Sequence, residues 1–309
     1  IGVANGSDAL EIALKIAGIK HGDKIATSAN AGMYSTNAIL SINAIPFFLD
    51  VDIDTQNLTY SEIVKCAKHN IKAIIVTHLY GLAVKEIKKI ALFCKKKKII
   101  LIEDCAQAHG AIINNKKVGT FGNISTFSFY PTKNLGAIGD AGLVTSNNHE
   151  LASKMRMIRE YGWKDRVSMQ PGRNSRLDEL QAAILRIKLK HLDEDNQKRR
   201  GIAEFYYEKL SELPILLPSI RANAESVFHL FVIQCEQRDE LQQFLTHQGI
   251  QSGIHYPTPI HLHKAFTSWG YPEGSCPIAE STAKRILSLP LFPEITDSQI
   301  ETVISAIKS

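Results

Sequence analysis

Long apolar runs are absent from this sequence, which argues against a membrane-spanning helix. No stretch approaches the roughly 20 consecutive apolar residues that such a helix needs. The first residues also lack the pattern of a secretory signal peptide. We therefore expect a protein that has no membrane partner.

Cysteine pairs and metal-ligand patterns are lacking as well. The five cysteines are odd in number and form no Cys-x-x-Cys pair, which indicates neither a disulfide framework nor a zinc site. His261 and His263 resemble a metal pair only superficially, because no carboxylate or cysteine completes a ligand set. Reduced thiols are typical of a cytoplasmic protein, and we expect no metal.

The net positive charge of the chain is small. The formal net charge is +5 at pH 7, and the basic residues are spread along predicted helices without interleaved aromatics. This pattern gives little support for nucleic-acid binding. The one compact basic run, Lys95 to Lys98, ends a helical pattern, where cations complement the carbonyl end of the helix dipole. We interpret it as a solvated helix terminus.

What the sequence does contain is a regular alternation of strand and helix patterns. The chain has 309 residues, of which 44% are hydrophobic, enough for a large core and two domains. Such βαβ patterning predicts an α/β fold with a mainly parallel sheet covered on both faces. The expected strands are 24–27, 46–49, 73–77 and 99–102, and the expected helices between them are 35–42, 61–69 and 85–97.

The pattern changes after residue 202. A long helix is predicted to begin at Arg176, to run into 193–200 and to link two domains. Shorter units follow: a strand at 227–233, a helix at 239–248 and a strand before His255. We predict a large α/β domain over residues 1–202 and a small α+β domain over residues 203–309.

Lys133 stands in an unusual setting for a lysine. The stretch from Ser125 to Gly142 is predicted to form a short buried strand that ends at Pro131, a tight glycine-rich loop that carries Lys133, and a return strand. Glycines let backbone approach a ligand closely. A pocket with little water disfavours the charged ammonium of a lysine and so favours the neutral amine that Schiff-base formation requires. The alternative is a structural lysine in a glycine-rich turn.

Asp104 gives a second signal. It follows the aliphatic run 99–102, and ligands of open α/β sheets bind beyond the carboxyl ends of such strands. A carboxylate there can pair with the protonated pyridine nitrogen of pyridoxal 5'-phosphate, whereas the alternative is a residue that caps the next turn. An aspartate about 30 residues before a loop lysine matches the minimal requirement of a pyridoxal-phosphate enzyme.

A helix start near the beginning of the chain gives a third signal. Asn5-Gly6-Ser7-Asp8 precedes a helical pattern, and free N–H groups at a helix start form a natural phosphate site. Plain N-capping by Ser7 or Asp8 is the alternative.

These segments together resemble the DegT/StrS family of sugar aminotransferases. The resemblance covers essentially the whole chain. It implies a pyridoxal-phosphate-binding large domain of the aspartate-aminotransferase type (fold type I), with a mainly parallel mixed sheet. The motifs that carry it are Asn5–Leu10, Glu103–Gly110, Ser128–Ala137 and Asn174–Ala182, followed by Ile254–Pro257 and Leu287–Pro290.

The resemblance also implies roles around the cofactor. Lys133 would hold pyridoxal phosphate as a Schiff base, Asp104 would keep the pyridine nitrogen protonated, and Gln107 would donate a hydrogen bond to the phenolic oxygen. The phosphate would be held by Gly6, Ser7 and Ser128, and by Asn174 from the other subunit of a homodimer with shared active sites. A helix-entry turn residue is the alternative for Asn174.

The implied reaction is transfer of an amino group, from glutamate, to a nucleotide-linked keto sugar by a ping-pong scheme. Lys133 would move the proton between cofactor and substrate. The run Tyr130–Gly136 resembles the branch that acts at C3, and Tyr130, His255 and Tyr256 are expected to line the substrate site. The expected setting is cytoplasmic amino-sugar synthesis for a surface polysaccharide such as lipopolysaccharide O-antigen, or for a glycoside.

Three alternatives remain within this interpretation. The same fold can act on a 4-keto sugar. A sugar dehydratase of this fold carries histidine in place of the Schiff-base lysine, so Lys133 argues against it. A regulatory homologue without turnover is disfavoured by the presence of Asp104, Gln107 and Lys133 together.

Some positions depart from the family pattern or fit it loosely. Gly32 stands where the family often has an aromatic residue that stacks on the cofactor ring, and Tyr34 is a candidate to replace it. His78 falls at the carboxyl end of a predicted strand, where it either lines the pocket or is a satisfied core histidine. The chain opens with Ile1, and family members generally carry a further segment before this point, so we expect part of the active-site wall and dimer surface to lie outside this sequence.

Overall fold

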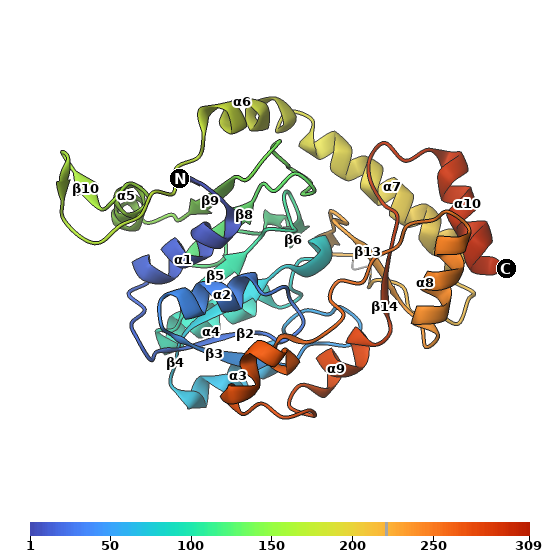
Figure 1. Ribbon diagram of the computed structural model, residues 1–309, viewed down its shortest axis with the longest axis horizontal. Coiled ribbons are helices and arrows are strands. Elements are labelled where there is room, and N and C mark those ends of the chain that lie inside the picture. The colour runs from blue at the N-terminus through green and yellow to red at the C-terminus, as the bar shows by residue number, and fades with distance from the viewer. Residues whose placement is uncertain (220–221) are drawn as a thin grey trace.

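A central sheet of seven strands organises the molecule, and a computed structural model describes residues 1–219 and 222–309 of it (Figure 1). The neighbours from β8 to β3 are parallel, whereas β9 is antiparallel to both β8 and β1. The predicted α/β class with a mainly parallel mixed sheet is therefore confirmed. The strands, in spatial order, are β1 (Gly2–Val3), β9 (Gly142–Thr145), β8 (Ile124–Ser128), β5 (Ile100–Asp104), β4 (Ile71–Thr77), β2 (Lys24–Ser28) and β3 (Ile45–Leu49).

The sheet is buried on both faces because its central strands are apolar on both sides. In β4, Ile74 and Val76 belong to one hydrophobic cluster and Ile75 belongs to the opposite one. Such two-sided burial is typical of parallel strands. One face is covered by α1 (Gly6–Ile16), α2 (Tyr34–Ser41) and α5 (His149–Ile158), and the other by α3 (Tyr60–Cys66) and α4 (Ile87–Lys97).

Residue chemistry sets the ends of these helices. The side chains of Asn5, Thr59 and Asn148 accept hydrogen bonds from the first turns of α1, α3 and α5. Each such cap satisfies a backbone N–H that has no partner within the helix. The helix starts therefore follow the positions of these short polar residues.

The predicted long helix is in fact two helices, and this part of the prediction was wrong. α6 (Glu179–Lys188) and α7 (Leu192–Leu210) are separated by a tighter turn, in which His191 N–H donates to Lys188 O at 3.0 Å. The sequence has no glycine or proline at this turn, so local preference does not explain the break. Figure 1 shows α7 running from the end of α6 to the C-terminal helices.

The last third of the chain contributes to two cores. β13 (Phe231–Gln234) pairs antiparallel with β14 (Ile286–Leu289), and α7, α8 (Arg238–His247) and α10 (Asp297–Lys308) pack around this pair. The short helix α9 (Pro277–Ala283) and the 3₁₀ turns Ile260–Leu262 and Lys264–Trp269 instead pack into the core of the large sheet. The division into domains 1–202 and 203–309 stays a prediction.

Two predicted strand boundaries differ in the structure. β8 ends at Ser128, before the predicted end at Pro131. The strand predicted at 227–233 begins only at Phe231, because Val227 N–H and Leu230 N–H donate to the main-chain oxygens of Gly81 and Tyr80. Residues 227–230 are therefore not part of β13 and lie against the loop that follows β4.

The remaining strands are short. β6 (Ile112–Ile113), β7 (Lys116–Lys117) and β12 (Ala224–Glu225) form a small sheet, and β10 (Trp163–Lys164) pairs with β11 (Val167–Ser168) in a hairpin. Within residues 1–219 and 222–309, no helix is both long enough and apolar enough to cross a membrane.

Candidate active site

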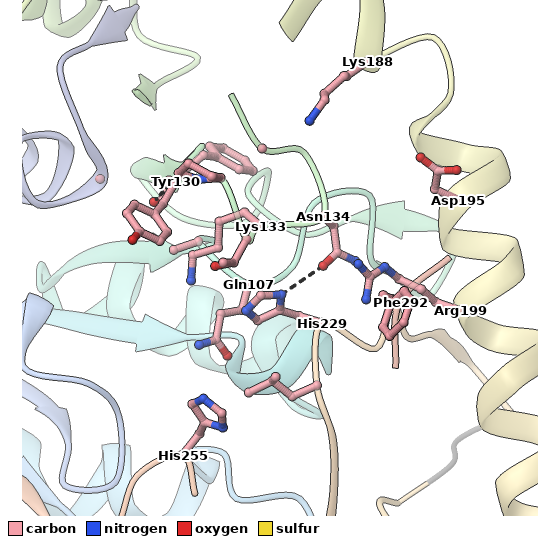
Figure 2. Close-up of a pocket in the computed structure, with 18 of the residues that line it drawn as sticks. Gln107, Tyr130, Lys133, Asn134, Lys188, Asp195, Arg199, His229, His255 and Phe292 are labelled. Carbon is pink, nitrogen blue, oxygen red and sulfur yellow. Dashed lines mark hydrogen bonds between the residues drawn. The ribbon is translucent and has the colours of Figure 1, made fainter. Parts of the chain in front are cut away.

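A cavity of about 1190 Å³ lies at the carboxyl ends of β5 and β8, bounded by α1, α7 and the loop after β14 (Figure 2). The walls include almost every residue that the sequence predicted for the site. Only Asn174 is not among the lining residues. The predicted residues that line the cavity are Gly6, Ser7, Asp104, Gln107, Ser128, Tyr130, Lys133, His255 and Tyr256.

The loop after β8 is held by main-chain turns and by its own apolar residues. Lys133 N–H donates to Tyr130 O, and Ala137 N–H donates to Phe129 O, each at 2.8 Å. A Cβ on Gly136 would lie 2.4 Å from Pro131 O, so the loop closes only with glycine at this position. Leu135 packs in a buried cluster that also holds Phe129. This support fixes the backbone from which Lys133 projects.

Lys133 points into the cavity and is half-buried there (Figure 2). Burial lowers the pKa of the Lys133 ammonium below its ordinary value of 10.5, and the nearby Asp104 carboxylate opposes this shift. Desolvation disfavours the charged form. A neutral, nucleophilic amine is therefore more accessible at this position than on an exposed lysine.

Asp104 ends β5 and is 5% exposed. Its carboxylate accepts hydrogen bonds from Ala106 N–H at 3.1 Å and from the Thr77 hydroxyl at 3.3 Å. Burial raises the pKa of Asp104, while these hydrogen bonds and Lys133 oppose the rise. A buried carboxylate of this kind is stabilised by a cation brought into the cavity.

Gln107 has a fixed side-chain orientation. Its Oε1 accepts from Tyr80 N–H at 2.7 Å, so its Nε2 is the end that faces the cavity. Nε2 donates to the Tyr256 hydroxyl at 3.3 Å and carries a second hydrogen. Tyr80 in turn donates its hydroxyl hydrogen to His255 O. The amide of Gln107 is therefore placed as a donor toward a ligand oxygen.

The start of α1 provides a cradle for an anion. Asn5 caps the helix through Asp8 N–H at 2.8 Å, and the N–H groups of Gly6 and Ser7 have no partner within the helix. A Cβ on Gly6 would lie 2.7 Å from Cβ of Ser128, so only glycine lets the helix start approach β8 this closely. The helix dipole favours negative charge at such a point. The cradle suits a phosphate.

His255 and Tyr256 close the cavity from the C-terminal part of the chain. Nδ1 of His255 lies 2.9 Å from the Ser288 hydroxyl, and burial lowers the pKa of His255. Burial also raises the pKa of the Tyr256 hydroxyl. Both side chains are therefore held in their neutral forms near neutral pH.

Gly32 is covered by two aromatic rings. A Cβ there would lie 2.5 Å from the Tyr34 ring and 3.1 Å from the Tyr256 ring. An aromatic side chain at position 32 has no room beside these rings. Tyr34 lines the cavity, and its predicted stacking on a cofactor ring stays a prediction.

Asn174 lies away from the cavity of its own chain. It is exposed and forms an antiparallel bridge with Glu160. Its neighbours hold it against the start of the chain: Arg173 pairs with Asp8 at 2.8 Å and with Glu11, and the Ser175 hydroxyl accepts from Ala4 N–H at 3.2 Å. A role for Asn174 in a partner's site stays a prediction.

His78 is a core histidine and does not line the cavity. Its Nδ1 accepts from Val84 N–H at 3.0 Å, so its Nε2 carries the proton and donates to Glu103 at 3.0 Å. Glu103 also accepts main-chain hydrogen bonds from Gly119, Phe121 and Gly122. His78, Glu103 and Cys105 could present ligand atoms to a metal, but the histidine and the carboxylate are already occupied.

His261, one member of the superficial histidine pair, also has a structural partner. It is buried, and its Nε2 lies 2.9 Å from Glu280, which also accepts from Gly274 and Cys276 N–H. His263 Nε2 instead lies 3.2 Å from Thr258 O. The two histidines therefore engage different partners.

Sequence reasoning missed several residues of the cavity. His229 was assigned to a strand, yet it is the one strongly polar side chain within the apolar run 227–233, and this contrast was a usable signal. Asn134 directly follows Lys133 and was not assigned a role. The far wall is formed by charged residues of α7 and its surroundings, namely Lys188, Glu194, Asp195, Lys198, Arg199 and Glu294.

Comparison with known proteins identifies a family. A model of the DegT/DnrJ/EryC1/StrS aminotransferase family matches residues 1–308. The chain is 44% identical, over 99% of its length and 84% of the relative, to the dTDP-3-amino-3,6-dideoxy-alpha-D-galactopyranose transaminase of Aneurinibacillus thermoaerophilus. It is 43% identical, over 99% of its length and 83% of the relative, to a protein of Geobacillus stearothermophilus described as a pleiotropic regulatory protein.

Among solved structures, DesV of S. venezuelae, in complex with a ketimine intermediate, is similar to this chain throughout. The TM-score is 0.96 at 38% sequence identity, and the match covers 100% of this chain and 83% of DesV. The similarity extends to the whole sheet and to the C-terminal elements that close the cavity.

Proposed function

Because the chain belongs to the DegT/DnrJ/EryC1/StrS aminotransferase family, we propose that it transfers an amino group to C3 of a nucleotide-linked keto sugar with the help of pyridoxal phosphate. The observation that carries this proposal is the half-buried Lys133 and the buried Asp104 on the walls of one cavity. An amine of lowered pKa and a carboxylate that needs a cation are the two groups that this cofactor requires.

The residues present fit the cofactor. Lys133 would supply the amine that binds the cofactor's aldehyde, and Asp104 would supply the charge partner for a protonated ring nitrogen. Gln107 Nε2 would donate to the phenolic oxygen. The start of α1, with Gly6, Ser7 and Ser128, would hold the phosphate. When bound, pyridoxal phosphate acts as an electron sink that stabilises negative charge on the carbon losing its proton.

Lys133 would have a second role once an amino donor occupies the site. Its neutral amine would serve as the general base and acid that moves a proton at the reacting carbon. Burial favours this role because it lowers the pKa of the amine toward the working pH. Asp104 opposes the shift and so limits it.

The proposed substrates are glutamate, as amino donor, and a keto sugar linked to dTDP or UDP. Relatives with these substrate classes support the sugar: besides the Aneurinibacillus protein, an Acidithiobacillus ferrooxidans relative at 41% identity is described as a UDP-N-acetyl-3-dehydro-alpha-D-glucosamine 3-aminotransferase. Tyr130, His255 and Tyr256 form the walls that meet the sugar. Cytoplasmic amino-sugar synthesis for a surface polysaccharide such as lipopolysaccharide O-antigen is the setting we propose.

We also propose that the protein works as a homodimer with shared sites. Leu180 and Ile187 of α6 and Leu189 after it are each more than half exposed, which is unusual for large apolar side chains grouped on one helix. In the dimer that we propose, a second copy of the chain covers these side chains and its Asn174 reaches the phosphate cradle.

A regulatory role without turnover is the second candidate, favoured by the description of the Geobacillus relative. The two functions differ in one observable, the reactivity of the bound cofactor. A regulator can bind the cofactor through Lys133 without transferring an amino group from glutamate.

The visible spectrum of the purified protein tests the proposal. Wild type with added pyridoxal phosphate should show the cofactor band, and glutamate should bleach it. Lys133→Ala should neither form that band nor respond to glutamate, while Lys154→Ala, which removes an exposed lysine paired with Glu150, should behave as wild type. A band that glutamate and amino sugars leave unchanged would favour the regulator.

A further inference from the structure

Asn134 ties the lysine loop to two other parts of the chain through its amide nitrogen. Nδ2 donates to Val227 O at 2.8 Å and to Asn196 Oδ1 at 3.0 Å. A main-chain oxygen only accepts, so the atom beside Val227 is the nitrogen of the amide. Asn196 is oriented in the same way, because its Nδ2 donates to His109 O at 2.8 Å. Oδ1 of Asn134 is therefore fixed as an acceptor.

This orientation determines the tautomer of His229. Its Nδ1 lies 3.1 Å from Oδ1 of Asn134. Because that oxygen has only lone pairs, Nδ1 carries the hydrogen and donates. In a neutral imidazole the other nitrogen, Nε2, is then an acceptor. Burial, with Lys133 and Arg199 nearby, holds the pKa of His229 well below its usual value, so the ring stays neutral.

Nε2 of His229 faces the cavity. The side chain is 9% exposed and belongs to the cavity wall. Figure 2 shows Nδ1 turned toward Asn134 and the opposite side of the ring turned toward Gln107 and Lys133. Within residues 1–219 and 222–309, no hydrogen bond reaches Nε2. The wall thus presents an oriented acceptor without a protein donor.

The chemistry of the two substrates decides what this acceptor meets. Glutamate presents carboxylates, which are themselves acceptors, and an amino group that the reaction consumes. A sugar presents hydroxyl groups, which are donors. Lys133 already has a charge partner in Asp104.

We propose that Nε2 of His229 accepts a hydrogen bond from a ring hydroxyl of the sugar next to the reacting carbon, and that Asn134 holds His229 in the tautomer that this contact needs. The inference rests on the proposed function and adds a residue that recognises the sugar. It predicts a contribution to the sugar half-reaction alone, because the glutamate half-reaction involves no hydroxyl.

The test compares the two half-reactions in single turnovers of the pyridoxal-phosphate form. The amino donors are glutamate and dTDP-3-amino-3,6-dideoxy-α-D-galactose, and the readout is the conversion of the cofactor band. His229→Phe should lower the second-order rate constant for the amino sugar about tenfold or more, because it removes one oriented hydrogen bond. It should leave the rate constant for glutamate within about twofold of wild type. His229→Gln keeps an amide oxygen near the position of Nε2 and should restore part of the loss.

Two further measurements make the result specific. An unchanged glutamate reaction excludes a folding defect as the cause of the loss in His229→Phe, and thermal unfolding of the apo protein should show that His229→Gln is about as stable as wild type. A second donor, dTDP-3-amino-3,4,6-trideoxy-α-D-glucose, lacks the 4-hydroxyl. If the loss in His229→Phe disappears with this donor, the 4-hydroxyl is the contact, and if it persists, the 2-hydroxyl is.

Several outcomes would overturn the inference. An equal loss in both half-reactions would mean that His229 acts through Lys133 or the cofactor, and no loss in either would mean that Nε2 meets no substrate. The proposed function fails separately, and is recognised in wild type: a protein that reacts with neither donor is not this transaminase, and one that reacts with glutamate but with no amino sugar has another acceptor.

Discussion

Lys133, which is half-buried, and Asp104, which is buried, are two groups whose charges depend on each other. Burial lowers the pKa of the lysine and raises the pKa of the aspartate, so each group alone favours its neutral form. Their opposite charges resist both shifts. A pKa below the ordinary value suits a lysine that acts in turn as nucleophile and as acid or base.

The pH dependence of cofactor binding follows from this pair. Only the neutral amine attacks the aldehyde, so the rate of cofactor incorporation should rise with pH to a plateau. The midpoint of this rise should lie below the ordinary lysine pKa of 10.5. Stopped-flow measurements of band formation, with N-acetyl-lysine amide as reference, give the midpoint. Asp104→Asn should move it lower still, because the carboxylate raises the pKa of Lys133. A midpoint at or above that of the reference would contradict this account.

The start of helix α1 shapes the proposed phosphate site. α1 begins at Gly6 because Asn5 caps it, and this start abuts the end of β8 with no room for a side chain. The phosphate cradle is thus a property of a helix and a strand together. Neither the capping pattern of the helix nor the pattern of the strand predicts how close the two elements lie to each other.

Gly6→Ala tests the cradle. The new Cβ would lie 2.7 Å from Cβ of Ser128, so the helix start must shift, and cofactor affinity should fall about tenfold or more, measured by spectroscopic titration. Gly201→Ala is the matched control within α7, where a Cβ meets nothing within 4 Å. It should leave cofactor affinity unchanged and stabilise the protein by roughly 0.5–1 kcal/mol through helix propensity. Equal affinities for both variants would argue against a phosphate at this helix start.

Helix α6 carries large apolar side chains that are exposed in the single chain. Ile187 is 63% exposed on its helix, and Leu92 on α4 is 62% exposed on another surface. If α6 belongs to a dimer interface, Ile187→Glu should shift the protein toward monomer, because it buries a charge without a partner. Leu92→Glu should leave the mass in solution unchanged. Light scattering after gel filtration measures both, and two variants of the same mass as wild type would exclude α6 from the interface.

Subunit complementation tests whether Asn174 acts on the partner's site. Lys133→Ala and Asn174→Ala homodimers should each be strongly impaired. In a mixed dimer, the subunit with intact Lys133 receives Asn174 from the Lys133→Ala subunit, so one site is complete. Random mixing should then restore about a quarter of wild-type activity, since half of the dimers are mixed and half of their sites are complete. No recovery after subunit exchange would place Asn174 in the site of its own chain or outside any site.

The amino-acid sequence by itself determined the class of fold and which residues gather at one edge of the sheet. Apolar strands alternating with amphipathic helices predict a parallel sheet, and Asp104 and Lys133 stand where such a sheet gathers its ligands. These inferences succeed because they depend on local periodicity and on which edge of a sheet a strand end reaches.

Other features were decided only by the tertiary structure. Residues 227–230 read as the start of a strand, but main-chain hydrogen bonds to Tyr80 and Gly81 remove them from the sheet and bring His229 to the cavity. The break between α6 and α7 has no glycine or proline to announce it. His78 occupies a strand end, as a ligand would, yet Glu103 and Val84 satisfy it in the core. In each case the outcome depends on partners distant in sequence, which no local pattern specifies.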